Sequence, residues 1–264
     1  IPPAICFEDP APFLYWANMP VMKKSRENFI KQCVDSMPHI KKPFRIMDIG
    51  CGEGSLTSRL VKKLQEKGKI NEIEEILLVD SSAGMIEVAE KTLSKDFSPS
   101  IIKAVHSRIE DCSEKISSTY DLAISSLAYH HIPLEKKKIH LEKLRSKVNH
   151  FVIFELDANN DIPEMHSPEL AMSNYQSYGR IIDFVFSCDS SVELAQNCVD
   201  SFLMTENVSF LTQPRGKRSD YHMLRTQWHE LFRNTLGKDF TCYSDATSYS
   251  DEFLDLFTIH YGRM

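Results

Sequence analysis

The sequence predicts an α/β protein in which helices cover both faces of a mainly parallel β-sheet. Three observations support this fold class. Short apolar runs alternate with amphipathic segments from Phe44 onward, which is typical of successive β-α units. A glycine-rich turn, residues 48–55, follows the first of these runs. With 264 residues, of which 42% are apolar, the chain can form one large domain or one domain with a sizeable insertion.

Apolar runs of strand length define the expected sheet, and they lie near 44–49, 75–80, 101–105, 120–126 and 150–156. The segments between them have helical periodicity. Leu56, Leu60 and Leu64 recur on one face of 55–67, and the segment 82–94 has the same pattern. Both segments are therefore expected to form helices that pack on the sheet.

The rest of the chain departs from this alternation. Residues 12–37 are expected to hold a helix, and residues 160–219 show helical periodicity without a clear strand, which predicts a mostly helical insertion. The remaining expected elements are a helix at about 220–236, ended by Gly237, and two strand-like runs at 239–246 and 255–263.

Composition and charge argue against several classes of protein. The formal net charge of −6, without a long block of lysine or arginine, disfavours nucleic acid as a partner. Seven cysteines without a C-x-x-C pair indicate reduced thiols and no structural zinc, so no metal site is expected. The apolar stretches fall well short of the ~20 residues of a membrane span, and the first residues lack a signal pattern. We therefore expect a soluble, cytoplasmic protein with no membrane partner.

The turn DIGCGEGS, residues 48–55, places Gly50, Gly52 and Gly54 directly after an expected strand. Glycines at such a turn let backbone N–H groups and the positive end of the next helix approach a ligand closely. The spacing G-x-G-x-G differs from the G-x-G-x-x-G of dinucleotide-binding proteins and from the phosphate-binding loop of P-loop nucleoside triphosphatases. A nucleotide-like ligand is expected, but not a triphosphate.

Polar residues follow the next three expected strands. Asp80 ends the second strand, where a carboxylate can accept hydrogen bonds from both hydroxyls of a ribose. A role as the acid at the start of the 82–94 helix is the alternative for Asp80. The third strand is followed by Glu110 and Asp111, and the fourth ends in SSLAYHH, residues 125–131.

Taken together, these segments resemble the class I S-adenosylmethionine-dependent methyltransferases. DIGCGEG, VDSSAGMIEVAEK, HSRIEDC and YDLAISSLAYHHI match that family's first four motifs in order and spacing. The resemblance covers about residues 40–158 together with the closing strand pair. It implies a Rossmann-like, doubly wound, seven-stranded sheet with an antiparallel terminal strand, and S-adenosyl-L-methionine as the cofactor.

The resemblance also implies a set of cofactor contacts. The glycine turn would line the methionine moiety, Asp80 would hold the ribose, neighbouring side chains would flank and read the adenine, and a serine would face the sulfonium. The residues implied in this site are Tyr15, Asp48, Gly50, Cys51, Gly52, Asp80, Ser81, Met85, Ile109, Glu110, Asp111, Ser125 and Ser126. Arg108 stands where the family often has aspartate, so the choice between Glu110 and Asp111 for the adenine stays open.

Methyl transfer from a sulfonium is an in-line displacement, so the protein mainly supplies alignment and a dry site. A hydroxyl acceptor would benefit from a general base. Ligands of open α/β sheets bind at the carboxyl ends of the strands, which makes His130, His131 and Asp157 the candidate catalytic residues. A structural role for the two histidines is an equal alternative.

Substrate choice is expected to depend on the helical insertion, because it would cover the open face of the sheet. Tyr175 and Tyr178 share one helical face there, with Arg180 close by. These three residues, together with Tyr129 and Tyr221, are the candidate substrate contacts. Packing within the insertion is the alternative role.

The resemblance divides the chain into four parts, which are an N-terminal helical segment over the cofactor site (1–40), a cofactor-binding core (41–158), a helical lid insertion (159–219), and the last helix with the terminal strand pair (220–264). The implied function is S-adenosylmethionine-dependent methylation of an N or O atom of a small molecule. Methylation of a protein or tRNA and a non-catalytic, cofactor-binding regulatory module are the alternatives.

Overall fold

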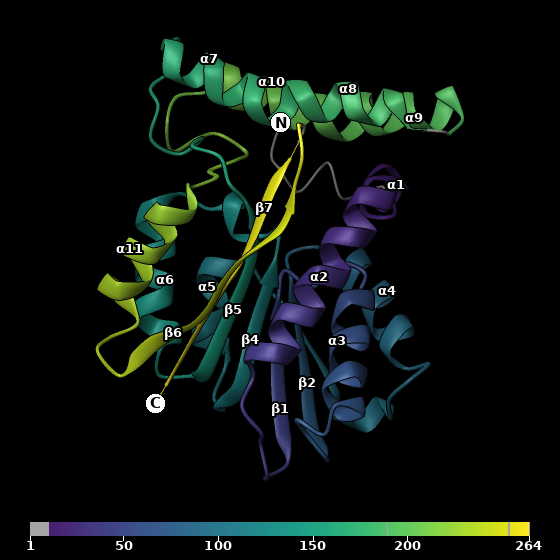
Figure 1. The fold of residues 1–264 in the computed structure, drawn as a ribbon, viewed down its shortest axis with the longest axis vertical. Helices are drawn as coiled ribbons and strands as arrows, with labels where there is room; N and C mark the ends of the chain where they lie inside the picture. The colour runs from purple at the N-terminus through teal and green to yellow at the C-terminus, as the bar shows by residue number, and fades with distance from the viewer. Residues whose placement is uncertain (1–10, 189, 253, 264) are drawn as a thin grey trace.

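The computed structural model describes residues 11–188, 190–252 and 254–263. In this part of the chain, seven strands form one sheet in the order β3-β2-β1-β4-β5-β7-β6 (Figure 1). The strands are β1 (Phe44–Ile49), β2 (Ile73–Asp80), β3 (Ile102–His106), β4 (Tyr120–Ser126), β5 (Val148–Leu156), β6 (Phe240–Ser250) and β7 (Asp255–Arg263). The first five are parallel, whereas β7 is antiparallel to β5 and β6. The predicted α/β class with an antiparallel terminal strand is confirmed.

Helices cover both faces of this sheet (Figure 1). One face carries α2 (Pro20–Ser36), α3 (Ser55–Glu66) and α4 (Ala83–Leu93), and the other carries α5 (Ile109–Lys115), α6 (Leu134–Leu144) and α11 (Arg225–Thr235). In β1, Phe44 and Ile46 point into the first layer, while Met47 and Ile49 point into the second. A strand buried on both faces needs a continuous apolar run, which is why the sequence pattern located these strands well.

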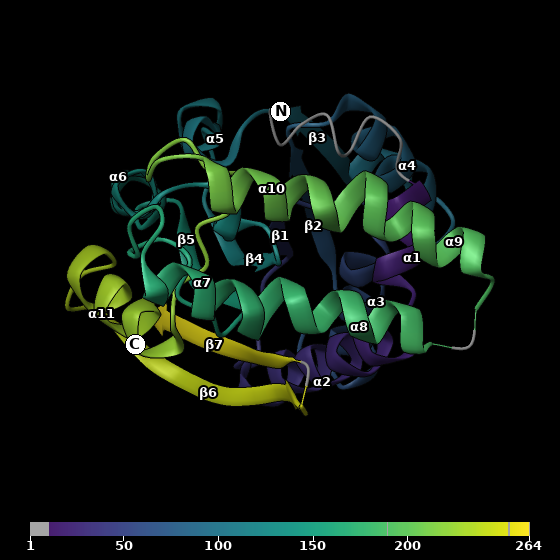
Figure 2. The same ribbon diagram turned by 90° about the horizontal axis from the view of Figure 1, so that it is seen from above.

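A further helical layer crosses the carboxyl ends of the parallel strands. Its elements are α1 (Ala11–Ala17), α7 (Pro168–Asn174), α8 (Arg180–Ser187), α9 (Val192–Cys198) and α10 (Met204–Thr212). A π-helical turn continues α7 into α8 and a second continues α9 into α10, so that two rods lie side by side over the sheet (Figure 2). The helical periodicity of 160–219 is confirmed in these elements.

Two helix boundaries differ from the sequence expectation. The helix expected over 12–37 is two helices, because Pro20 begins α2 in the first turn, where a missing N–H leaves no hydrogen bond unmade. The helix expected from residue 220 begins only at Arg225, since residues 220–223 form a buried segment outside any helix or strand. Short 3₁₀ turns at Pro99–Ile101 and Tyr129–His131 complete the described helical elements. None of the described helices is both long enough and apolar enough to cross a membrane.

Candidate active site

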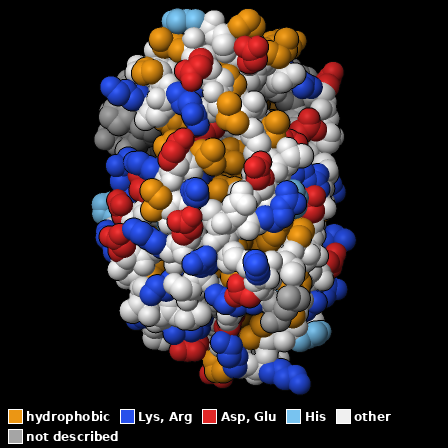
Figure 3. Space-filling view, turned by 90° about the vertical axis from the view of Figure 1, so that its left-hand side faces the viewer, with side chains coloured by type: hydrophobic (Ala, Val, Ile, Leu, Met, Phe, Trp, Pro, Cys, Tyr) orange, Lys and Arg blue, Asp and Glu red, His pale blue; other side chains and the backbone are white. Residues whose placement is uncertain are grey.

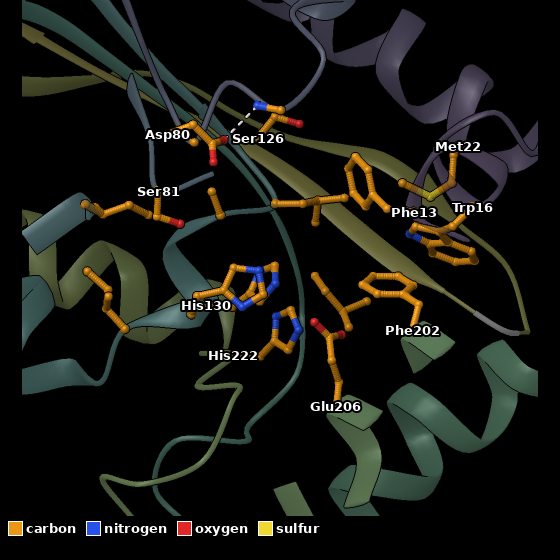
Figure 4. Close-up of a pocket in the computed structure, with 18 of the residues that line it drawn as sticks. Phe13, Trp16, Met22, Asp80, Ser81, Ser126, His130, Phe202, Glu206 and His222 are labelled. Carbon is orange, nitrogen blue, oxygen red and sulfur yellow. Dashed lines mark hydrogen bonds between the residues drawn. The ribbon is translucent and has the colours of Figure 1, made fainter. Parts of the chain in front are cut away.

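A cavity of about 380 Å³ lies between the carboxyl ends of the strands and the rods of α7–α10 (Figure 4). Its two ends differ in chemistry. The strand-end half is lined by Gly50, Gly52, Asp80, Ser81, Met85 and Ile109. The helical half is lined by Phe13, Trp16, Tyr178, Ile181, Phe202 and Leu203. The cavity therefore joins a wall of backbone and carboxylate to a largely apolar chamber.

The glycine turn forms part of the wall because its backbone is left-handed. The φ angle is +76° at Gly50 and +52° at Gly52. A Cβ atom at Gly50 would lie 2.3 Å from the Cβ of Ala128, so only glycine lets the ends of β1 and β4 approach this closely. Leu127 also has a positive φ of 51°, which is uncommon for a side chain of its size. The backbone of the glycine turn thus packs directly against Ala128 at the cavity.

Asp80 connects the end of β2 to the glycine turn. Gly52 N donates a hydrogen bond of 3.0 Å to Asp80 Oδ2, and Ser82 N donates one of 2.8 Å to Oδ1. Burial raises the pKa of Asp80, and the hydrogen bonds from Ser82 and Gly52 oppose that rise. An accepting carboxyl group is thereby fixed at the cavity wall.

A polar cluster lies where the two halves meet, and Figure 4 shows its members His130, His222 and Glu206 pointing into the same part of the cavity. We define this polar cluster as His130, His131, Glu155, Tyr178, Glu206, Asp220 and His222. His130 Nδ1 lies 3.0 Å from Glu155 Oε2, and its ring stacks on that of His222 with centroids 4.2 Å apart. The Tyr178 hydroxyl donates to Asp220 Oδ2 and lies 3.0 Å from Glu206 Oε2.

Backbone contacts of the segment before α11 bring the distant members of the polar cluster together. Tyr221 N donates a hydrogen bond of 2.6 Å to the carbonyl oxygen of His130, and Asn160 N donates one of 2.9 Å to that of His222. The buried ammonium of Lys137 donates to the carbonyl of Tyr221. The residues next to Tyr221 are therefore held against the exit of β4.

Burial and mutual charge set the protonation of the polar cluster. Burial raises the pKa of Glu206 to about 8, and the charge of Asp220 adds to the rise. Burial alone would lower the pKa of His131, but the neighbouring Asp220 and Glu206 outweigh it and raise the pKa to about 9. Burial, aided by His130, lowers the pKa of His222 to about 3. Despite its burial, Asp220 has a pKa held below the usual range by the surrounding histidines. The polar cluster thus combines charged and neutral groups in one buried place.

The model of the methyltransferase domain family matches residues 40–233, which include the glycine turn, Asp80 and the whole polar cluster. The chain belongs to this family of methyltransferases. The family prediction made from the sequence is confirmed. A curated relative, malonyl-[acyl-carrier protein] O-methyltransferase of Priestia megaterium (strain DSM 319 / IMG 1521), is 30% identical over 158 residues, which is 58% of this chain and 50% of that protein. The match therefore spans half the length of that relative.

Solved structures of low sequence identity share the fold of this methyltransferase. The plantazolicin methyltransferase BamL, solved in complex with SAH, has a TM-score of 0.59 at 12% identity, covering 99% of this chain and 94% of that chain. Magnesium protoporphyrin IX methyltransferase (ChlM) from Synechocystis PCC 6803, with bound SAH, has a TM-score of 0.55 at 13% identity, covering 99% and 98%. The DhpI–SAH complex has a TM-score of 0.55 at 11% identity, covering 96% and 91%. At such identities the similarity establishes the fold.

Most of the expected cofactor residues line the cavity of the methyltransferase. They are Gly50, Gly52, Asp80, Ser81, Met85, Ile109, Glu110 and Ser126. Arg108 also lines it. Of the two acids after β3, Glu110 faces the cavity and accepts a hydrogen bond of 2.9 Å from Lys136 Nζ, whereas Asp111 lies outside the lining.

Four other expected cofactor residues lie behind or beside the cavity, and their placement is corrected. Asp48 is buried beneath the glycine turn, where it accepts a hydrogen bond from the Thr57 hydroxyl. Ser125 Oγ donates to the carbonyl of Ile49 at 2.8 Å, and Cys51 is a buried residue of the turn outside the lining. The Tyr15 hydroxyl bonds Ser190, while its helix neighbours Phe13 and Trp16 line the cavity instead.

Of the expected catalytic and substrate residues, His130, His131 and Tyr178 line the cavity. The others are corrected. The Tyr129 side chain is buried between the sheet and helices α6 and α11, where its hydroxyl lies 2.9 Å from His140 Nε2. Asp157 accepts a hydrogen bond of 2.9 Å from Arg225 N at the surface, and Tyr175 is 63% exposed on the outer face of its rod. Arg180 and Tyr221 also lie outside the lining.

Three residues that the sequence reasoning missed are Arg26, Glu206 and His222, which line the cavity. Two of them carried a usable signal. Arg26 follows Met22 and precedes Ile30 at helical spacing, so its charge interrupts an apolar face. Glu206 likewise lies between Leu203 and Phe210. His222 had no such pattern, because it lies in an irregular segment.

Proposed function

We propose that this methyltransferase transfers the methyl group of S-adenosyl-L-methionine to a nitrogen or oxygen atom of a small molecule. The observation that carries the proposal is the single cavity that joins the glycine turn and Asp80 to an apolar chamber under α8 and α10. Its volume of about 380 Å³ falls in the range of small-molecule sites. The SAH named in several structures of the same fold supports this cofactor.

In the strand-end half, the chain offers a partner for each part of the cofactor. Asp80 accepts the ribose hydroxyls, and Met85 and Ile109 contribute apolar surface for the adenine. Arg26 reaches the cavity from α2; its Nη1 donates to the carbonyl of Ala17 at 3.2 Å, while its buried Nε has no hydrogen-bond partner among the described residues. A guanidinium in this position is suited to the α-carboxylate of the methionine moiety.

The acceptor occupies the helical half. Phe13, Trp16 and Phe202 provide apolar and aromatic walls, which exclude water and hold a substrate with an apolar body. The polar cluster between the halves orients the acceptor atom toward the methyl group. In-line displacement then depends mainly on this alignment, because the sulfonium already activates the methyl group.

Methylation of a nucleic acid or a large protein is the weaker alternative. The rods α7–α10 cover the strand ends, and the formal net charge is −6. On the face shown in Figure 3, lysine and arginine are interspersed with aspartate and glutamate instead of forming a continuous basic surface. These features favour a substrate small enough to be enclosed.

Titration calorimetry with S-adenosylmethionine and with its demethylated product tests the cofactor half of the proposal. We expect both to bind wild-type protein and to bind Asp80→Ala weakly. Release of demethylated product on addition of panels of small amines and hydroxyl compounds tests the acceptor half. Absence of binding by both cofactor forms would falsify the proposal.

A further inference from the structure

The polar cluster contains three donor atoms that converge on one point. His130, His131 and Asp220 each offer one ligand atom, and these atoms all lie within 4.8 Å of one another. Asp220 Oδ1 is 3.7 Å from His130 Nε2 and 3.4 Å from His131 Nδ1. The two adjacent histidines lie on the turn after β4, and Asp220 lies far from them in sequence, in the segment before α11, so spacing alone could not reveal the group.

We infer that His130, His131 and Asp220 form a binding site for a divalent transition-metal ion. The separations of 3.4 and 3.7 Å exceed those of ordinary N–H···O hydrogen bonds. Ligands held about 2.1 Å from a tetrahedral metal ion lie about 3.4 Å from one another. Asp220 Oδ1 therefore lies at the spacing of two ligands of one ion from each imidazole nitrogen.

The environment of His130 orients its Nε2 as a metal ligand. Glu155 Oε1 accepts backbone N–H groups from Ala128 and Tyr129 at 3.2 and 3.0 Å. Glu155 Oε2 lies 3.0 Å from His130 Nδ1, so the carboxylate accepts from Nδ1–H and leaves the lone pair of Nε2 toward Asp220. A carboxylate that orients a histidine in this way is the usual support of a metal-binding imidazole.

Asp220 provides an independent indication of a missing ligand. The side chain is fully buried, and its Oδ2 accepts the hydrogen bond of Tyr178. Its Oδ1 makes no hydrogen bond of ordinary geometry within the described part of the chain, and its nearest nitrogen atoms are His131 Nδ1 at 3.4 Å and His130 Nε2 at 3.7 Å. A buried carboxylate oxygen without such a bond requires a physical explanation, and a cation at the converging point supplies one.

A second set of donors, His130, Glu155 and His222, is the less suitable site. It would use His130 Nδ1 and Glu155 Oε2, the two atoms already joined at 3.0 Å. A metal ion would have to break that bond, whereas the set with Asp220 keeps it. We therefore assign the ion to His130, His131 and Asp220.

Two imidazoles and one carboxylate favour zinc, iron(II) or manganese over magnesium and calcium, which prefer oxygen ligands. His130 and His131 line the cavity, so an ion held by them would be within reach of an acceptor bound there. This step rests on the proposed function. A metal ion beside the acceptor favours a hydroxyl group as the group that is methylated. The ion would acidify the bound O–H, whose proton passes to solvent. The oxygen lone pair then forms the C–O bond as the C–S bond breaks, with its electron pair remaining on sulfur.

Metal content measured on tag-free protein tests the site. Wild-type protein is incubated in separate samples with Zn²⁺, with Mn²⁺ or, anaerobically, with Fe²⁺, and is then desalted. We expect at least one of these samples to retain about one metal ion per chain. Asp220→Asn and His131→Gln are expected to retain less than about a tenth of that amount. His39→Gln is the matched control, since His39 is exposed and its Nδ1 lies 2.9 Å from the carbonyl oxygen of Gly68. When Co²⁺ is added instead, only wild-type protein and His39→Gln should show visible absorption bands of bound cobalt.

Calorimetry with demethylated cofactor, run on the same samples, separates the two proposals. We expect wild-type protein to bind it both before and after loading with metal, because the cofactor contacts lie in the strand-end half. Retention of no metal by wild type, or equal retention by wild type and His131→Gln, overturns the metal site and leaves the methyltransferase assignment intact. If wild-type protein does not bind the demethylated cofactor, the proposed function is overturned instead. If Asp220→Asn does not fold, His131→Gln alone decides.

Discussion

The backbone amide of Gly52 donates a hydrogen bond of 3.0 Å to Oδ2 of Asp80. One carboxylate therefore holds the glycine turn in place and is also the group that would accept the ribose hydroxyls. Asp80→Asn keeps the shape but removes the charge. Since hydrogen bonds to charged groups contribute about 1.5–3 kcal/mol, we expect affinity for demethylated cofactor to fall at least about tenfold by calorimetry.

Asp35→Asn, which alters an exposed carboxylate paired with Lys31, is the control for the Asp80 variant. It should bind the cofactor as wild type does. Equal affinity of Asp80→Asn and wild type would remove the assignment of Asp80 to the ribose.

Arg26→Gln tests the carboxylate site. The guanidinium would bind the amino-acid end of the cofactor, so the variant should bind S-adenosylhomocysteine about tenfold or more weakly. It should bind 5′-methylthioadenosine, which lacks the amino-acid end, with unchanged affinity. Arg59→Gln, near Glu27 on the surface, is the control. A parallel loss for both ligands would contradict the role proposed for Arg26.

Gly50→Ala and Gly68→Ala separate steric overlap from backbone conformation. Both positions have positive φ, but a Cβ at Gly50 meets Ala128 at 2.3 Å, while a Cβ at Gly68 has no neighbour within 4 Å. We expect Gly68→Ala to lower the free energy of unfolding by about 1–2 kcal/mol, and Gly50→Ala by roughly 2–5 kcal/mol. Urea unfolding without cofactor measures the difference, and equal losses would argue against close packing of the two turns.

Asp48 makes stability depend on pH. Burial raises its pKa to about 7, so the folded state binds a proton that the unfolded state has released above its ordinary value of 3.8. Stability should therefore fall as pH rises from about 4 to about 7. Asp48→Asn cannot titrate and should gain stability relative to wild type above about pH 7, on the order of 1–4 kcal/mol. Urea unfolding at several pH values tests this, and identical slopes for both proteins would contradict it.

The strands and the strand-end half could be predicted largely from local sequence. Leu77, Leu78 and Val79 form part of an apolar run that a strand buried on both faces requires, and the glycine turn and Asp80 each lie at the carboxyl end of such a run. The same reasoning misplaced Tyr129. The 3₁₀ turn after β4 directs this side chain into the layer of α6 and α11 and the adjacent His130 into the cavity.

The acceptor side of the cavity was less accessible to prediction. Glu206, Asp220 and His222 meet His130 only because the rods and the segment before α11 fold back over the strand ends. That arrangement depends on long-range packing, which sequence periodicity does not encode. Tyr178 was found from its helical spacing, yet the same spacing also selected Tyr175, which faces solvent.

The helix that carries Arg26 is anchored on the last two strands. Asn28 Nδ2 donates to the carbonyl of Ser248 at 2.7 Å across 220 positions of sequence, and Gln32 Nε2 donates to that of Thr247 at 2.9 Å. Ser36 Oγ lies 2.8 Å from His260 Nδ1. During synthesis, α2 leaves the ribosome long before the strands that accept these hydrogen bonds exist. A nascent chain can therefore anchor α2 in this way only after the β6–β7 hairpin has been translated, and a chain stopped before residue 240 would expose the edge of β5 and leave Asn28 and Gln32 without these partners.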